Sequence, residues 1–176
     1  METTQYIGQW VSPKREVMKN PDGSTTFLVR DFTMTENEWK LVLSGFGDES
    51  SNESKLFEAV VEGHYEVVGN SPTAEGAVET NFGFEKITFT PFMDFFVPML
   101  NNANSGNGNW VVGESQDVSS TGALFFAPVS QYPKEYDLLK LDGSNLYFGK
   151  RPADNNMGSP ERRPTEVTAD PVTKVA

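Results

Sequence analysis

The sequence predicts an all-β protein: a small antiparallel barrel or half-barrel of about eight or nine strands with one short helix. Three observations favour this class. Apolar and polar residues alternate with a period of two along most of the chain, while helical periodicity is scarce. The alternating segments are short and follow one another at hairpin-like spacing. Closing so many strands into a barrel would remove exposed sheet edges.

The alternation is clearest in Leu56–Val68, where Phe57, Ala59 and Val61 alternate with mostly charged residues. In Val78–Pro91 the alternation slips near Gly83, which predicts a β-bulge. The predicted strands are Trp10–Val17, Thr26–Met34, Trp39–Phe46, Leu56–Val68, Val78–Pro91, Trp110–Val118, Gly122–Val129, Tyr136–Leu141 and Asn145–Phe148.

Two segments depart from the strand pattern. Phe92–Asn101 is apolar on nearly every side, which predicts a short helix or turn buried against the sheet or plugging a barrel end. Residues 151–176 hold four prolines and few apolar residues, which predicts an extended, peripheral tail. We therefore expect a single barrel domain over residues 1–150, followed by this tail. The opening Gly8-x-Trp10 suits a first strand whose aromatic ring fills the end of the barrel.

Composition excludes several classes of function. With 14 basic and 25 acidic residues the net charge is −11, which argues against nucleic acid and anionic membranes as partners. The chain has no cysteine, so disulfides, thiolate catalysis and cysteine-bound zinc are excluded. No signal peptide or membrane-spanning apolar run is present. As given, the chain predicts a soluble cytoplasmic protein, or a secreted or periplasmic one if a signal was removed.

Arg30 is the most informative charged residue, because it shares a strand face with Leu28, Phe32 and Met34. A buried guanidinium needs a partner. It is either a structural ion pair, an outward-facing residue, or an anchor for the head group of an apolar ligand. Its candidate protein partners are Glu16, Glu79, Asp117 and Glu135. With the aromatic rings, the predicted ligand-binding set is Arg30, Trp10, Glu79, Phe89, Phe96, Phe126 and Tyr136.

Two other side chains are candidates for chemistry. His64, the single histidine, shares the outer strand face with Glu62 and Glu66, where a solvated surface is favoured over a divalent metal site. Asp94 is the one charge in the apolar segment, and it either caps the helix, faces solvent or serves as an acid/base group at a cavity mouth. No nucleotide-binding or hydrolase motif is present. The sequence thus predicts no metal and no cofactor, and it assigns no reaction.

Several ordered motifs resemble the adenomatosis polyposis coli down-regulated domain, a family known from secreted inhibitors of Wnt signalling and also found in bacteria. They span residues 7–165. The matching pieces are Gly8–Ser12 with Glu16-Val17, Phe27–Arg30, Gly63–Tyr65, Glu79, Thr90-Pro91, Leu100-Asn101, Trp110 with Gly113, Gln116–Val118, Glu135-Tyr136, Phe148-Gly149, Arg151-Pro152, and Pro160–Arg163 with Thr165.

This resemblance implies a lipocalin-like open barrel whose hydrophobic cavity binds lipids or acyl chains. Family cysteines are replaced here, two of them by Arg15 and Ala123 and a third near Asn104, which indicates a cysteine-free, bacterial type of member. A role in Wnt inhibition is therefore not carried over.

Three functions follow as hypotheses. The favoured one is binding of a hydrophobic small molecule, a lipid or acyl chain, in the barrel cavity. The second is an isomerase or cyclase acting on an apolar substrate, which would need Glu79, Asp94, Arg30 or Tyr136 to converge on the cavity. The third is a protein-interaction module with a filled barrel. The oligomeric state is not predicted.

Overall fold

The computed structural model describes residues 3–20 and 22–175, and most of their regular structure is β-strand. One α-helix, α1 (Phe96–Asn102), and three 3-10 turns, η1 (Thr4–Tyr6), η2 (Asn52–Ser54) and η3 (Pro160–Arg162), accompany the strands. The strands are β1 (Gly8–Val11), β2 (Glu16–Lys19), β3 (Thr25–Met34), β4 (Glu38–Phe46), β5 (Lys55–Asn70), β6 (Val78–Gly83), β7 (Lys86–Pro91), β8 (Gln116–Asp117), β9 (Lys134–Asp142), β10 (Asn145–Phe148) and β11 (Val172–Lys174).

Eight of these strands close into an antiparallel ring. From β3 the neighbours are β1, β11, β10, β9, β6, β5 and β4, and β4 pairs back onto β3. The predicted fold class is therefore confirmed: the protein is an all-β, lipocalin-like antiparallel barrel with one short helix. Within the ring every strand has two neighbours, so the ring exposes no sheet edge.

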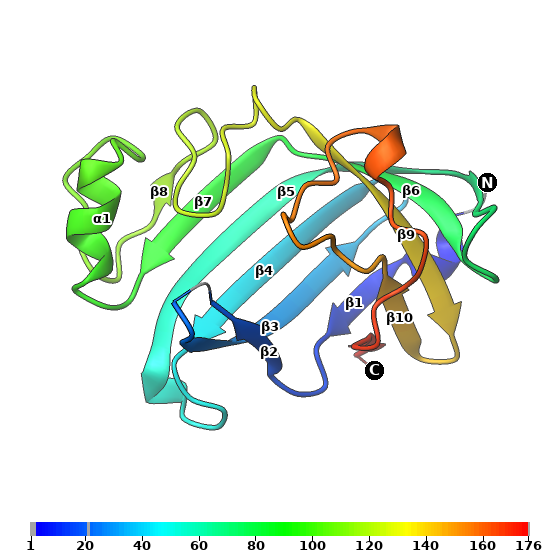
Figure 1. The fold of residues 1–176 in the computed structure, drawn as a ribbon, viewed down its shortest axis with the longest axis horizontal. Coiled ribbons are helices and arrows are strands. Elements are labelled where there is room, and N and C mark those ends of the chain that lie inside the picture. Colours follow the sequence, from blue (N-terminus) through cyan, green and yellow to red (C-terminus); the bar gives the residue numbers. More distant parts are fainter. Residues whose placement is uncertain (1–2, 21, 176) are drawn as a thin grey trace.

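Three further strands extend the sheet beyond the ring. β2 pairs with the first residues of β3, β7 pairs with the first half of β5, and β8 pairs with β7. We call β2, β7, β8 and the parts of β3, β4 and β5 beside them the open section. Figure 1 shows that the sheet runs from the ring, where β9, β10 and the C-terminal end lie, towards α1 at the opposite end of the molecule.

A pair of glycines marks the place where the ring and the open section separate. β5 pairs with β6 from Tyr65 onward and with β7 up to Glu62, so the chain crosses from β6 to β7 opposite Gly63. The prediction of one strand with a bulge near Gly83 is wrong. β6 ends at Gly83, and a separate strand, β7, begins at Lys86. The slip in alternation that suggested the bulge is this break between two strands.

The C-terminal segment was predicted to be peripheral, and this is wrong. Its end forms β11, which pairs with β1 and β10, and Val172 is fully buried there. Residues 150–166, here called the strap, run beside β6 and β9, where Arg163 donates hydrogen bonds to backbone carbonyls of Thr80 and Asp137. The segment is extended, as predicted, but it completes the barrel.

Three predicted strands were also wrong in extent. Trp10–Val17 is two strands, since Pro13 lies between them and has no backbone N–H to donate to a ladder. Trp110–Val118 contains only the two-residue β8. Gly122–Val129 is a loop with a single bridge between Ala123 and Phe126. The last two segments are rich in apolar residues but lack a partner strand along most of their length.

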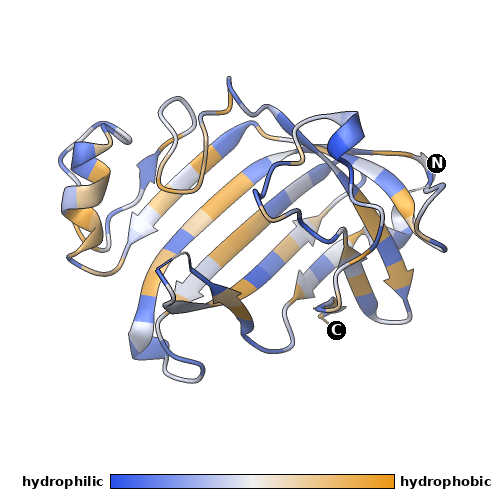
Figure 2. Ribbon diagram, in the orientation of Figure 1, coloured by the Kyte–Doolittle hydropathy of each residue, from blue (hydrophilic) through white to orange (hydrophobic). Residues whose placement is uncertain are grey.

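The hydrophobic core is continuous along the inner face of the sheet. Figure 2 shows hydrophobic and hydrophilic bands alternating along β3, β4 and β5, as the period-two pattern requires. The side chains that share the inner face are largely removed from water in the ring. Among the largest fully buried side chains of the whole core are Trp10, Met34, Val61, Phe89, Leu139 and Leu146.

Candidate functional site

The strand register places Arg30 on the inner face at the junction of the ring and the open section. On one side of it, Phe32 pairs with Trp10 of β1; on the other, Leu28 pairs with Glu16 of β2. Across the sheet, Arg30 pairs with Leu43 of β4. The predicted sharing of one face by Arg30 and its apolar neighbours on β3 is thus confirmed.

Inside the ring, aromatic rings fill the space beside this junction. Phe148 stacks on Phe32 with ring centroids 4.4 Å apart, and Phe82 lies 5.9 Å from Phe148. Trp39 packs edge-on against Phe82 at 5.2 Å. These four side chains are at most 6% exposed. A ligand therefore finds no room among them, and the accessible part of the inner face is elsewhere.

The open section leaves its inner face partly exposed to solvent. Leu28, Leu41 and Leu43 lie on the same face as Arg30, and all three are half-buried. Phe125, from the loop after β8, packs edge-on against Phe57 of β5 at 5.2 Å and is 47% exposed. This face therefore combines accessible apolar side chains with a single guanidinium. Such a surface complements an amphipathic ligand that has an apolar chain and an anionic head.

The Arg30 guanidinium is held in place by hydrogen bonds from two of its three nitrogens. Its Nε donates to Glu16 Oε1 at 2.8 Å, and its Nη2 donates to the Asp170 carbonyl at 2.9 Å. Ser12 Oγ also donates to Glu16 Oε1, at 2.6 Å, and so orients the carboxylate. Within residues 3–20 and 22–175, Nη1 has no hydrogen-bond partner. The guanidinium also lies 5.6 Å from the Phe148 ring centroid.

Of the four predicted partners of Arg30, only Glu16 contacts it. Glu79 and Glu135 pair instead with Arg163 and Arg151, two arginines of the strap. Sequence alone could not choose among the carboxylates, because the choice depends on which face each strand presents to its neighbour.

Apart from Arg30, the six predicted ligand-binding residues are divided among three places. Trp10 and Phe89 belong to the buried core, and the Trp10 indole N–H donates to the Tyr6 carbonyl at 2.8 Å. Phe96 and Phe126 lie at the α1 end. Glu79 and Tyr136 lie with Arg163, whose guanidinium is 5.4 Å from the Tyr136 ring centroid.

The α1-end rings lie further along the same inner face as Arg30, whereas Glu79 and Tyr136 lie on the opposite face of the sheet. Phe96 packs edge-on against Phe57 at 6.2 Å, and Phe126 lies 4.7 Å from Phe125. Glu79 sits on the face of β6 opposite to Phe82, because the two differ in strand parity. Only Arg30, among the predicted polar residues, lies on the accessible inner face.

The polar groups that an enzyme would need do not converge. Arg30 is at the inner junction, Glu79 and Tyr136 are under the strap, and Asp94 is exposed just before α1. General acid/base catalysis requires its groups within hydrogen-bond reach of one substrate. The observed arrangement offers no such common point for these four residues.

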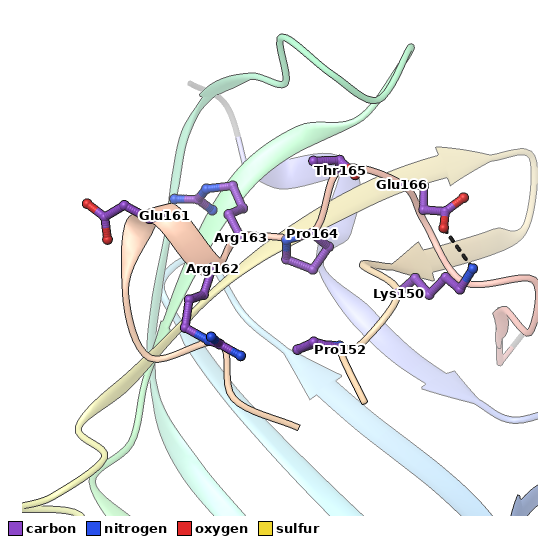
Figure 3. A pocket seen from close by; sticks show the side chains of 8 residues that line it. All are labelled: Lys150, Pro152, Glu161, Arg162, Arg163, Pro164, Thr165 and Glu166. Atoms are coloured by element: carbon purple, nitrogen blue, oxygen red, sulfur yellow. Dashed lines mark hydrogen bonds and ion pairs between the residues drawn. The ribbon is translucent and has the colours of Figure 1, made fainter. Parts of the chain in front are cut away.

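A hollow of about 290 Å³ lies on the strap, on the outside of the barrel. Figure 3 shows its lining, with Lys150 joined to Glu166, and Arg163 and Pro164 between them and η3. The Lys150–Glu166 pair is 2.7 Å long, and Arg162 pairs with Asp154. Because its cations already have carboxylate or carbonyl partners, this hollow is best explained as the packing of the strap on the barrel.

A buried polar cluster beside the strap was missed by sequence reasoning. Asp137 is 3% exposed and accepts hydrogen bonds from the backbone N–H of Leu138 and of Gly149, at 2.7 and 2.9 Å. Burial, and then the nearby charge of Glu135, raises the pKa of Asp137 to about 7. A signal was present in the sequence, since Asp137 has the same strand parity as Leu139.

Tyr132 joins this cluster from the loop before β9. Its hydroxyl donates to Glu135 at 3.3 Å and accepts from the Met157 N–H at 2.7 Å. Burial and the Glu135 carboxylate raise the pKa of Tyr132 to about 12. Arg151 of the strap donates a hydrogen bond to Glu135 of β9, so the cluster links the strap to that strand. Asp137 and Glu135 are buried in this cluster, whereas the Arg151 side chain is partly exposed.

His64 lies outside, as predicted, but its neighbours differ from those expected. It contacts Glu85 and, at 3.9 Å, Glu38, in an exterior hollow of about 290 Å³ that also includes Glu62. Among the described residues no three histidine, aspartate or glutamate side chains are arranged to hold a metal ion.

No known protein-family model matches the chain. The resemblance to the adenomatosis polyposis coli down-regulated domain therefore stays a prediction. None of the helices within residues 3–20 and 22–175 is long and apolar enough to cross a bilayer.

Proposed function

We propose that the protein binds an amphipathic small molecule, an acyl chain or lipid with an anionic head, on the inner face of its open section. The observation that carries the proposal is the half-buried Arg30 guanidinium, held by Glu16 with Nη1 unbonded and surrounded by accessible leucines. The chain of the ligand would cover Leu28, Leu41 and Leu43, where each Å² of apolar surface removed from water contributes roughly 25 cal/mol.

The predicted resemblance supports the same ligand class, since it implies lipid or acyl-chain binding. We accordingly propose that the chain is a cysteine-free member of that family. We place the ligand on the open section and not in a barrel cavity, because aromatic side chains fill the interior of the closed strands beside Arg30. The open section is the part of the inner face that supplies contact area.

A face-specific pair of substitutions tests where the ligand lies. Leu43→Glu should abolish binding of oleate, because it places a carboxylate on the inner face beside Arg30. Val42→Glu is the matched control: it is the next residue on β4, is also half-buried, and faces the other side of the sheet. Oleate affinity is measured by isothermal titration calorimetry. Equal affinities in the two variants would contradict the proposed location.

The anchoring role of Arg30 has a separate test. A charge-assisted hydrogen bond is worth about 1.5–3 kcal/mol, so its loss should raise the Kd for oleate roughly 10–100-fold. The double variant Arg30→Met/Glu16→Gln removes the anchor without leaving Glu16 unpaired. Glu16→Gln alone removes the competing carboxylate and should bind oleate at least as tightly as the parent. If the double variant and the parent bind oleate equally, Arg30 is not the anchor.

A further inference from the structure

Charge is distributed unevenly along this acidic chain. Residues 87–133 make up more than a quarter of the sequence, yet they include only three charged residues, Asp94, Glu114 and Asp117. The remaining residues of that stretch are apolar or are uncharged asparagine, serine, threonine, glycine and glutamine. The stretch contains α1, β8 and their loops (Figure 1), so these segments carry little charge, and Lys55 of β5, which lies 4.9 Å from the Phe92 ring centroid, is paired with Glu58.

The same end exposes large apolar side chains. Phe95 is 53% exposed, Met99 50%, Val111 48%, Phe125 47% and Val112 36%. We call these five residues the apolar tip. Elsewhere in the described residues, large exposed apolar side chains such as Val17 and Val68 occur among charged neighbours. Single exposed apolar residues are ordinary, whereas a group in an uncharged region marks a contact surface.

The apolar tip is held by buried neighbours. Phe95 packs on Phe96 with ring centroids 4.4 Å apart, and Phe96 is 8% exposed. Phe125 is fixed by Phe57, as described above. Val111 follows Trp110, which is 4% exposed and packs edge-on against Phe89 at 6.1 Å. Phe95, Phe125 and Val111 therefore each lie beside a packed aromatic side chain, which anchors this part of the tip to the core.

We propose that the apolar tip docks on an uncharged, zwitterionic lipid surface. Five half-exposed side chains present about 400 Å², which is half of the roughly 800 Å² per partner that a stable protein interface buries. A net charge of −11 repels a second copy of the chain and an anionic bilayer alike. A zwitterionic surface needs no positive charge, and binding to it scales with the apolar area that enters the headgroup boundary while uncharged polar groups remain hydrated.

This inference goes beyond ligand binding by the open section and does not depend on Arg30. It does place the open section beside a lipid surface, because Phe125 of the tip packs on Phe57, an inner-face residue of β5. A lipid-derived ligand would then have a short path to the leucines of that face.

Vesicle flotation tests the proposal with the whole chain. We expect the protein to float with phosphatidylcholine vesicles, and the variant Phe95→Ser/Met99→Ser to partition about tenfold or more weakly. Val17→Ser/Val68→Ser is the matched control, since those residues are 62% and 54% exposed but lie outside the tip, on β2 and β5. Its partitioning should equal that of the parent. Met99→Ser alone provides a milder variant should the double one unfold.

Adding phosphatidylglycerol to the vesicles should weaken binding, because the protein is acidic. Failure of the parent to float with phosphatidylcholine, or equal flotation of the tip and control variants, would overturn the proposal. So would a concentration-dependent dimer in sedimentation velocity that the tip substitutions abolish, which would assign the tip to a second copy. Oleate affinity measured on the tip variants should be unchanged, so failure here is distinguishable from failure of the ligand-binding proposal.

Discussion

Gly63→Ala is expected to destabilise the barrel by roughly 3 kcal/mol or more. A Cβ at this position would lie 1.9 Å from the Gly83 carbonyl oxygen, a backbone atom that cannot move aside as a side chain would. That carbonyl also accepts the Trp39 indole N–H at 3.0 Å. Relieving the clash would therefore shift the crossing from β6 to β7 and weaken a buried hydrogen bond.

Gly69→Ala provides the comparison on the same strand. A Cβ there meets no atom within 4 Å, so the substitution should change stability by no more than about 1 kcal/mol. Urea unfolding of the parent and both variants measures the difference. If Gly63→Ala were as stable as Gly69→Ala, the close approach of the two strands at the crossing would be refuted.

Asp137 should make the protein less stable as the pH rises from about 4 to about 7. The unfolded chain releases this proton near the ordinary aspartate pKa of about 3.9. The folded protein retains the proton until the pH reaches about 7, because burial and the Glu135 charge oppose ionisation. Between these values the native state binds more protons than the unfolded state, so the free energy of unfolding falls with rising pH and levels off above 7.

Asp137→Asn should flatten this part of the pH profile and stabilise the protein above pH 7. One pKa unit corresponds to about 1.4 kcal/mol, so the gain is on the order of 2–4 kcal/mol. Asparagine keeps an Oδ1 that can accept from the Leu138 and Gly149 N–H groups. Urea unfolding between pH 4.5 and 8 gives the profile, with Asp142→Asn, at the exposed end of β9, as control. Parallel profiles for Asp137→Asn and the parent would show that Asp137 ionises normally.

The candidate site was predictable from the sequence only in part. Arg30 was identified because it interrupts an apolar face, and a period-two pattern is a local property that survives folding. Glu79 and Tyr136 were predicted to share one ligand-binding site with Arg30. In the structure these two side chains face the strap instead. Nothing local indicates that Arg163 covers them, because its contact with Asn81 joins residues far apart in the chain.

What the sequence by itself determined is the class of the protein and the faces of its long strands. Alternation in β3, β4 and β5 requires an apolar side and a polar side, and the number of short strands favours closure. Only the tertiary structure decided how the barrel closes: a three-residue strand from a proline-rich segment, with Val172 at its start, fills the gap between β1 and β10. Such pairings join strands that are far apart in the sequence. Their stability comes from burial that exists only once those strands are together, so no local sequence pattern predicts them.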